Sequence, residues 1–187
     1  MLSQSSLEAA SLLLGWVLVR DTPDGQVKIR IVETEAYHQD DPASHSFRGI
    51  TTRTAPMFEA GGRLYIYFTY GMHYCLNIVT GPKGRGEGVL IRAGEPVAGL
   101  GIMRKYRGKI KDTRKLANGP GKLAQALGIR DTLLSGKILN TSSIWLESSK
   151  EPVPADDIIA SSRIGITKAA EMPWRFYIKD NPFVSKL

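Results

Sequence analysis

The chain has 187 residues, of which 42% are hydrophobic and 23% charged, and its formal net charge is +7. This length suits one domain with a sizeable core, and no apolar run reaches the roughly 18 residues of a membrane span. Cys75 is the only cysteine, so no disulfide can form within the chain, which favours a reducing compartment.

The order of the predicted elements indicates a mixed fold. A capping box at Ser5–Glu8 begins the first helix, period-2 alternation marks the early strands, and Pro96 suits a first helical position. The sequence predicts, in order, a helix over 5–14, strands over 16–20 and 27–36, a long loop over 38–62, strands over 64–70, 74–79 and 89–92, helices over 96–106 and from 118 to Gly128, and strands over 144–147 and 174–178.

The strand over 27–36 contains the most informative irregularity. Its apolar alternation over 27–31 places Glu33, Glu35 and Tyr37 on the same face, because side chains two residues apart share a face. A carboxylate on a core face is costly unless it is paired, hydrogen-bonded or protonated. One interpretation is that the strand leaves the core at Val32 and its end is solvated. The other is a site that desolvates a carboxylate so that it acts as a base.

Positive charge is concentrated between Arg104 and Lys122, where Asp112 is the only acidic residue. A basic block of this kind suits a polyanion such as nucleic acid. A solvated basic loop and helix would show the same composition.

The strands over 64–70 and 74–79 are separated by three residues, which predicts a hairpin rich in tyrosine. Tyrosines in strands are mostly packing residues, but Tyr70 at the tip should project from the turn. There it could act as a wedge that opens a base stack. Tyr37, Tyr65 and Tyr67 could form aromatic walls around an extruded base.

The three histidines, His38, His45 and His73, show no spacing typical of metal ligands. No Ser/His/Asp arrangement stands out either. We therefore expect neither a metal nor a cofactor.

Six blocks in order resemble the alkyladenine (3-methyladenine) DNA glycosylase family, from about Leu12 to Ser185. Each block alone is weak evidence, but six in sequence are specific. The blocks are Val-Glu-Thr-Glu-Ala-Tyr (32–37), Ala-Ser-His-Ser (43–46), Ala-Pro-Met-Phe (55–58), Leu-Tyr-Ile-Tyr-Phe-Thr-Tyr-Gly-Met-His-Tyr-Cys-Leu-Asn (64–77), Val-Leu-Ile-Arg-Ala-Gly-Glu-Pro (89–96) and Asn-Gly-Pro-Gly-Lys-Leu-Ala-Gln-Ala-Leu (118–127).

The resemblance implies one catalytic domain over residues 1–187, of the α+β class, with a mainly antiparallel curved sheet, flanking helices and a protruding hairpin. It implies a monomeric enzyme that flips alkylated or deaminated purines out of duplex DNA and hydrolyses the N-glycosidic bond without a lysine nucleophile. No membrane partner is expected. The location would be the cytoplasm or nucleoid in a bacterium and the nucleus in a eukaryote.

The resemblance also assigns the chemistry. Glu35 matches the general base that deprotonates the attacking water, and Arg92 matches the residue that helps to hold that water. Tyr37, His45 and Tyr67 match the walls of the base pocket. Glu33 would then have a supporting role and pair with a cation or a backbone amide.

Further residues match the specificity and DNA-binding parts of the family pattern. Asn77 matches the side chain that crowds the exocyclic amine of guanine, and Tyr70 matches the aromatic that fills the gap in the duplex, with Met72 and His73 beside it. The residues expected to contact the DNA backbone are Arg48, Arg53 and Lys122. The loop over 46–54 matches loosely, with Thr54 where asparagine is common.

Two other functions remain open from the sequence. The first is a non-enzymatic module that binds damaged or single-stranded nucleic acid through its tyrosines and basic face. The second is a glycosidase with Glu33 and Glu35 as its carboxylate pair. Such acids flank the scissile bond from separate positions, which an i, i+2 pair on one strand does poorly.

Overall fold

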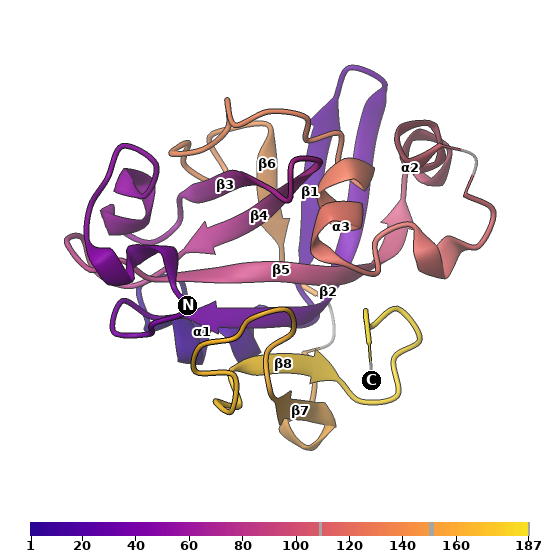
Figure 1. Cartoon of the computed structure of the whole chain (residues 1–187). Coiled ribbons are helices and arrows are strands. Elements are labelled where there is room, and N and C mark those ends of the chain that lie inside the picture. Colours follow the sequence, from indigo (N-terminus) through magenta and orange to yellow (C-terminus); the bar gives the residue numbers. More distant parts are fainter. Residues whose placement is uncertain (109, 150–151, 187) are drawn as a thin grey trace.

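The computed structural model describes residues 1–108, 110–149 and 152–186. Within these residues an antiparallel sheet curls across the molecule and three α-helices flank it (Figure 1). The strands are β1 (Val17–Thr22), β2 (Gly25–Tyr37), β3 (Leu64–Thr69), β4 (His73–Val79), β5 (Gly88–Ala98), β6 (Ile144–Glu147), β7 (Ile158–Ser161) and β8 (Arg175–Ile178), and the helices are α1 (Ser6–Leu12), α2 (Leu100–Arg107) and α3 (Pro120–Ala126). The predicted α+β class with a curved antiparallel sheet is confirmed.

The two longest strands, β2 and β5, form the middle of the sheet, whose order is β3-β4-β5-β2-β1-β6. The other edge of β2 has two partners in succession: β1 pairs with its first half, and β8 pairs with Glu33, Thr34 and Glu35. The segment that carries both glutamates therefore has hydrogen-bonded strands on both sides. Such a position holds side chains more rigidly than a loop would.

The pairing of β2 with β5 is irregular at Glu33. The register shifts between Ile31 and Glu33 and again between Glu33 and Thr34. The two shifts compensate, so that the register after Thr34 is the same as before Ile31. Glu35 therefore keeps the alternation that begins with Ile31, as the sequence predicts. Residues 31–36 are all buried, so the expectation of a strand that runs into solvent is wrong.

The helices cover the sheet on two sides (Figure 1). The predicted capping box forms at Ser5 and Glu8 and begins α1. This helix packs on β2, where the Thr34 hydroxyl donates to the Ala10 carbonyl at 2.8 Å. Helix α3 packs against β4 and β5 and begins with Pro120 at its N-terminus. Because Thr34 and Glu35 are neighbours in a strand, Glu35 points away from α1.

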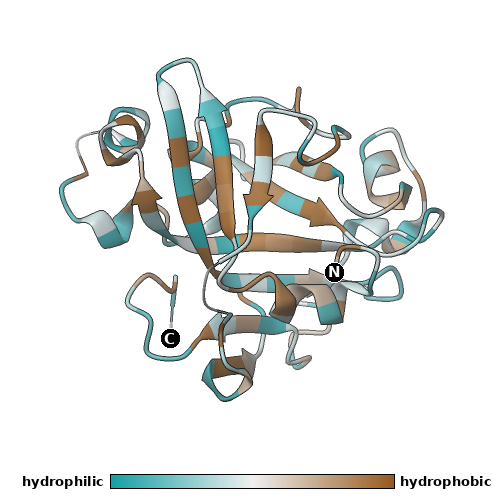
Figure 2. Ribbon diagram, turned by 180° about the vertical axis from the view of Figure 1, so that it is seen from behind, coloured by the Kyte–Doolittle hydropathy of each residue, from teal (hydrophilic) through white to brown (hydrophobic). Residues whose placement is uncertain are grey.

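Apolar residues gather on the central strands (Figure 2), and buried residues of α1 and α3 join them in the core. The main core contains Leu18, Ile29, Ile78 and Ile91, each with no exposed surface. In the part of the chain that the structure describes, no helix is both long and apolar enough to cross a membrane.

Three expectations about elements need correction. Pro96 does not begin a helix: it lies within β5 opposite Ile29, at a register shift, and the helix begins at Leu100. A proline is tolerated in a strand at such an irregularity. The short strand β7 has no counterpart in the prediction. The loop over 38–62 contains two short 3₁₀ helices, His45–Arg48 and Ala55–Phe58.

Candidate active site

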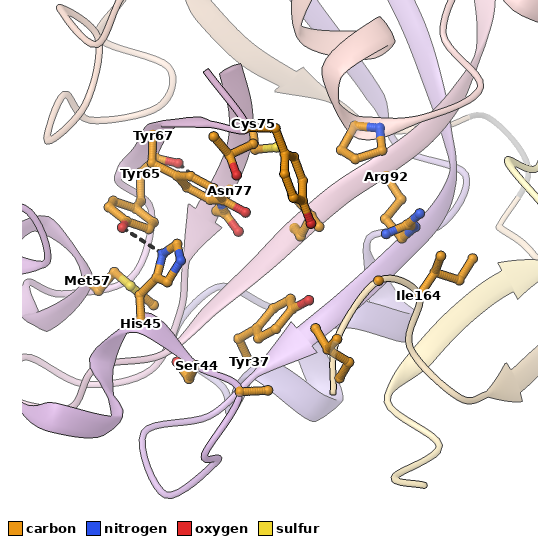
Figure 3. A pocket seen from close by; sticks show the side chains of 17 residues that line it. Tyr37, Ser44, His45, Met57, Tyr65, Tyr67, Cys75, Asn77, Arg92 and Ile164 are labelled. Atoms are coloured by element: carbon orange, nitrogen blue, oxygen red, sulfur yellow. Dashed lines mark hydrogen bonds between the residues drawn. The ribbon is translucent and has the colours of Figure 1, made fainter. Parts of the chain in front are cut away.

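A cavity of about 220 Å³ opens on the face of the sheet that carries Glu35. Drug-sized ligands occupy pockets of roughly 300–1,000 Å³, so this cavity suits a single flat group. Figure 3 shows its side chains arranged around a central space. The lining residues are Tyr37, Ala43, Ser44, His45, Met57, Tyr65, Tyr67, Thr69, Tyr70, Cys75, Asn77, Leu90, Arg92, Pro120, Ile164, Gly165 and Ile166.

One wall of the cavity is aromatic. The rings of His45 and Tyr67 meet edge to face with centroids 4.5 Å apart, and the rings of Tyr65 and Tyr67 are 5.5 Å apart. Tyr37 lies across the cavity from them (Figure 3). Aromatic faces stack on any base without reading its hydrogen-bonding edge.

His45 is held on both sides of its ring. Nδ1 lies 2.9 Å from the Tyr65 hydroxyl, and the Arg53 guanidinium approaches Nε2 at 3.4 Å. Because arginine only donates hydrogen bonds, Nε2 accepts and Nδ1 carries the proton. Desolvation beside the tyrosines, with the Arg53 charge as a second cause, lowers the pKa of His45 to about 4. At neutral pH the His45 ring is therefore uncharged, although part of it stays open to solvent.

Glu35 has no exposed surface, and its three partners, Tyr37, Arg92 and Ile164, all line the cavity. Its Oε1 accepts from the Ile164 backbone N–H at 2.7 Å and pairs with Arg92 Nη1 at 3.2 Å, and its Oε2 accepts from the Tyr37 hydroxyl at 2.9 Å. Burial raises the pKa of Glu35, and this outweighs the opposing effects of Arg92, Ile164 and Tyr37. Glu35 is therefore a stronger base than an exposed glutamate.

Arg92 connects the two glutamates. Its Nη1 contacts Glu35, and its Nε donates to Glu33 Oε1 at 3.1 Å. Glu33 is also fully buried, and it pairs with Arg175 and with Ser185. The expected pairing of Glu33 with a cation or an amide is thus present. Because two arginines and a serine bind the Glu33 carboxylate, it is not free to act on a substrate as a second catalytic acid. This disfavours the glycosidase function.

The tip of the β3–β4 hairpin is exposed and strained. Tyr70 and Gly71 both have positive φ, 51° and 65°, and the Met72 N–H donates to the Thr69 carbonyl at 3.2 Å. Tyr70 is 77% exposed and Met72 69% exposed. Non-glycine residues in this strained conformation cluster at functional sites. Tyr70 also lines the cavity, so one side chain connects the tip to the cavity.

The three residues expected at the DNA backbone have different surroundings. Arg48 is exposed at the end of a 3₁₀ helix. Arg53 lies against the cavity wall, with its guanidinium carbon 5.4 Å from the centroid of the Tyr67 ring. Lys122 is exposed on α3, and its amine donates to Asn118. Of the basic block between Arg104 and Lys122, Lys109 lies outside the described residues.

A buried arginine that the sequence did not point to supports Tyr37. The Arg163 guanidinium lies 4.8 Å from the centroid of the Tyr37 ring and 5.0 Å from that of Trp174, and it pairs with Asp41. The next residue, Ile164, donates to Glu35. Asp41 is 122 positions away in the sequence, so neither periodicity nor local composition could reveal the pair.

The chain matches the methylpurine-DNA glycosylase family model over residues 1–182. Three similar relatives come from Carboxydothermus hydrogenoformans, Nitrosospira multiformis and Chlorobaculum parvum, at 49%, 48% and 49% identity. The matches cover 96%, 98% and 96% of this chain and 93%, 91% and 86% of the relatives. Each relative carries the provisional name 3-methyladenine DNA glycosylase. The chain therefore belongs to the methylpurine-DNA glycosylase family, DNA repair enzymes that hydrolyse N-glycosyl bonds to remove alkylated purines.

Proposed function

We propose that the whole chain, residues 1–187, is one catalytic domain that acts as a monomer on double-stranded DNA. It flips an alkylated or deaminated purine, such as 3-methyladenine or hypoxanthine, into the cavity and hydrolyses its N-glycosidic bond with a water that Glu35 activates. The product is an abasic site. The observation that supports this most strongly is the buried Glu35 carboxylate, which is bonded to Arg92 and Tyr37, two residues that line the cavity.

The proposed step uses the free acceptor capacity of Glu35. Among the described residues only Tyr37 donates to its Oε2, and a carboxylate oxygen can accept two hydrogen bonds. A water held there, with Arg92 beside it, gives its proton to Glu35 as its oxygen bonds to the sugar C1′. The bond from C1′ to the purine breaks, and its electron pair leaves with the base.

The charge of the damaged purine determines how much catalysis the hydrolysis requires. A purine alkylated on a ring nitrogen carries positive charge in the nucleotide and departs as a neutral base, so modest activation of the water suffices. The aromatic cavity receives such a cation favourably, and its wall histidine is neutral at physiological pH. Hypoxanthine departs as an anion unless it gains a proton, so it depends more on the site.

The cavity composition agrees with simple hydrolysis. A glycosylase that also cleaves the strand needs an amine nucleophile that forms a Schiff base. No lysine is among the described residues that line this cavity. Flipping costs a few kcal/mol, least for a damaged base, and a side chain that fills the vacated space offsets part of this cost. Tyr70, with Met72 and His73 beside it, is the proposed wedge.

The test uses duplexes that carry hypoxanthine or 3-methyladenine, followed by alkaline cleavage of abasic sites. The wild-type chain should form abasic product, and Glu35→Gln should slow excision by about 10²–10⁴-fold, the usual contribution of a general base, while it still binds the lesion duplex. No product from any alkylated or deaminated purine would support the non-enzymatic binder instead. Normal turnover by Glu35→Gln would place the base elsewhere.

The same variant separates function from folding. Because burial raises the pKa of Glu35 in the folded state, the unfolded chain loses this proton at lower pH, and stability decreases as the pH rises through that window. At neutral pH the ionised carboxylate therefore costs folding free energy. We expect the melting temperature of Glu35→Gln to be no lower than that of the wild type, and this result would exclude misfolding as the cause of lost excision.

A further inference from the structure

Glu33 is a fully buried carboxylate with four hydrogen-bond contacts from three residues. Its Oε1 accepts from Arg92 Nε at 3.1 Å, Arg175 Nε at 2.7 Å and Ser185 Oγ at 2.9 Å, and its Oε2 accepts from the Ser185 backbone N–H at 2.6 Å. These partners come from β5, from β8 and from the C-terminal segment, at positions 59, 142 and 152 residues away. Three distant parts of the chain therefore converge on this one side chain.

The consequence for Arg92 is that two carboxylates share its single positive charge. Nε faces Glu33, and Nη1 faces Glu35 Oε1 at 3.2 Å. An arginine that pairs with one carboxylate alone forms a strong two-bond contact, and such a contact keeps the carboxylate ionised and makes it a weaker base. Glu33 prevents this arrangement because it occupies Nε.

The other groups around Glu35 do not replace the effect of Glu33 on Arg92. Tyr37 on β2 and the Ile164 N–H donate to Glu35 and weaken it as a base. Tyr67 on β3 and Cys75 on β4 face it as neutral groups, since burial raises the pKa of both. The Arg163 guanidinium lies over Tyr37 and pairs with Asp41. Burial of Glu35 and the charge of Glu33 both raise the pKa of Glu35.

We propose that Glu33 is a positioning residue of the reaction: held by Arg175 and Ser185, it divides the charge of Arg92 between two carboxylates and thereby keeps Glu35 able to take a proton from water. This inference rests on the proposed role of Glu35 as the base. Arg175 has an indirect part, because it takes up some of the Glu33 charge that would otherwise act on Arg92.

The arrangement predicts pH shifts of opposite sign. Excision requires ionised Glu35, so the excision rate rises with pH as Glu35 loses its proton. We call this rising part of the pH profile the acid limb. In Glu33→Gln, Arg92 is free to pair with Glu35 alone, and the limb should move down by about one pH unit, with a plateau lowered about threefold because the base is weaker. In Arg175→Gln, Glu33 attracts Arg92 more strongly, and the limb should move to higher pH. Arg175→Lys keeps the charge and should restore the wild-type limb.

The measurement is single-turnover excision from a hypoxanthine duplex across pH, with the thermal melt of each variant. A role limited to structure would lower the rate at every pH and leave the limb in place, and this result would overturn the inference. If Glu33→Gln does not fold, the two Arg175 variants provide the test. An acid limb at the same pH in Arg175→Gln and Arg175→Lys would also overturn the inference. Full activity of Glu35→Gln would instead remove the base on which the inference rests.

Discussion

At the scale of single residues, Asn77 shows how the sheet aims a polar group into the cavity. Its side-chain N–H donates to the Tyr65 carbonyl on the neighbouring strand at 3.1 Å, and its side chain is nearly buried. The amide is therefore fixed beside the aromatic wall (Figure 3). A fixed group at this place can exclude a base by its shape alone.

We expect Asn77→Ser to relax the exclusion of guanine. The shorter side chain leaves room for the exocyclic amine, and a change of this size in a pocket alters discrimination by roughly 10-fold or more. The measurement is the ratio of guanine to hypoxanthine excision in matched duplexes, with hypoxanthine excision as the control for an intact site. A ratio equal to that of the wild type would contradict the steric role.

At the scale of elements, the β3–β4 hairpin combines strain at its tip with support at its base. A non-glycine residue in the left-handed region costs about 1–3 kcal/mol, and Tyr70 is such a residue. Below the tip, His73 packs so closely on α3 that a side-chain carbon at Gly121 would lie 2.9 Å from its ring. The helix thus supports the hairpin while the tip stays exposed.

We expect Tyr70→Asn to lose excision without loss of stability. Asparagine tolerates the left-handed conformation, and the ring that it removes is mostly exposed, so the melting temperature should stay the same or rise. Binding of lesion duplex and single-turnover excision should both weaken, whereas Tyr70→Phe, which keeps the ring, should retain most of both. An unchanged excision rate in Tyr70→Asn would mean that the ring has no part in flipping.

Local patterns predicted most of these elements. The capping box at Ser5, the alternation over 27–31 and the three residues between β3 and β4 are signals that a few neighbouring residues carry, and the structure confirms each. The expectation of a helix that begins at Pro96 is wrong because the helical preference of proline does not reveal that an irregularity between β2 and β5 accepts it. Strand β7 is four residues long and depends on β8 for its pairing, so its own sequence gives little signal.

The site residues were predictable where they lie in the sequence blocks that resemble the family, and the other site residues were not. The residues assigned by resemblance to the base pocket, Tyr37, His45, Tyr67 and Asn77, all line one cavity. Arg163 and Arg175 were missed because each is defined by contacts with residues more than 120 positions away. A buried arginine and a solvated one look the same in a sequence.

At the scale of the whole molecule, the net charge of +7 favours any DNA, damaged or not. Each phosphate that a cation neutralises lowers the logarithm of the binding constant by about 0.9 per decade of salt. Lys122 lies on α3 beside the hairpin, in a groove that it shares with Tyr70, His73 and Arg107. This groove adjoins the cavity, which suits the backbone on either side of a flipped nucleotide.

We expect Lys122→Ala to weaken binding to lesion and undamaged duplexes alike and to reduce the salt slope by about one. The measurement is the dissociation constant of both duplexes at several salt concentrations. Lys179→Ala, which removes an exposed lysine just after β8, is the matched control and should leave the slope unchanged. An equal slope for Lys122→Ala and the wild type would place the contact elsewhere.

The attachment of β8 has a consequence for the effect of heat on the enzyme. This strand joins β2 through three residue pairs, all within the segment from Glu33 to Glu35, and it carries Arg175. Its other partner is the four-residue strand β7, and segments with few contacts open before the core does. Fraying of β7 and β8 would take Arg175 away from Glu33 while β2 and β5 remain paired. We therefore expect heating to stop excision at a temperature below that at which the whole protein melts.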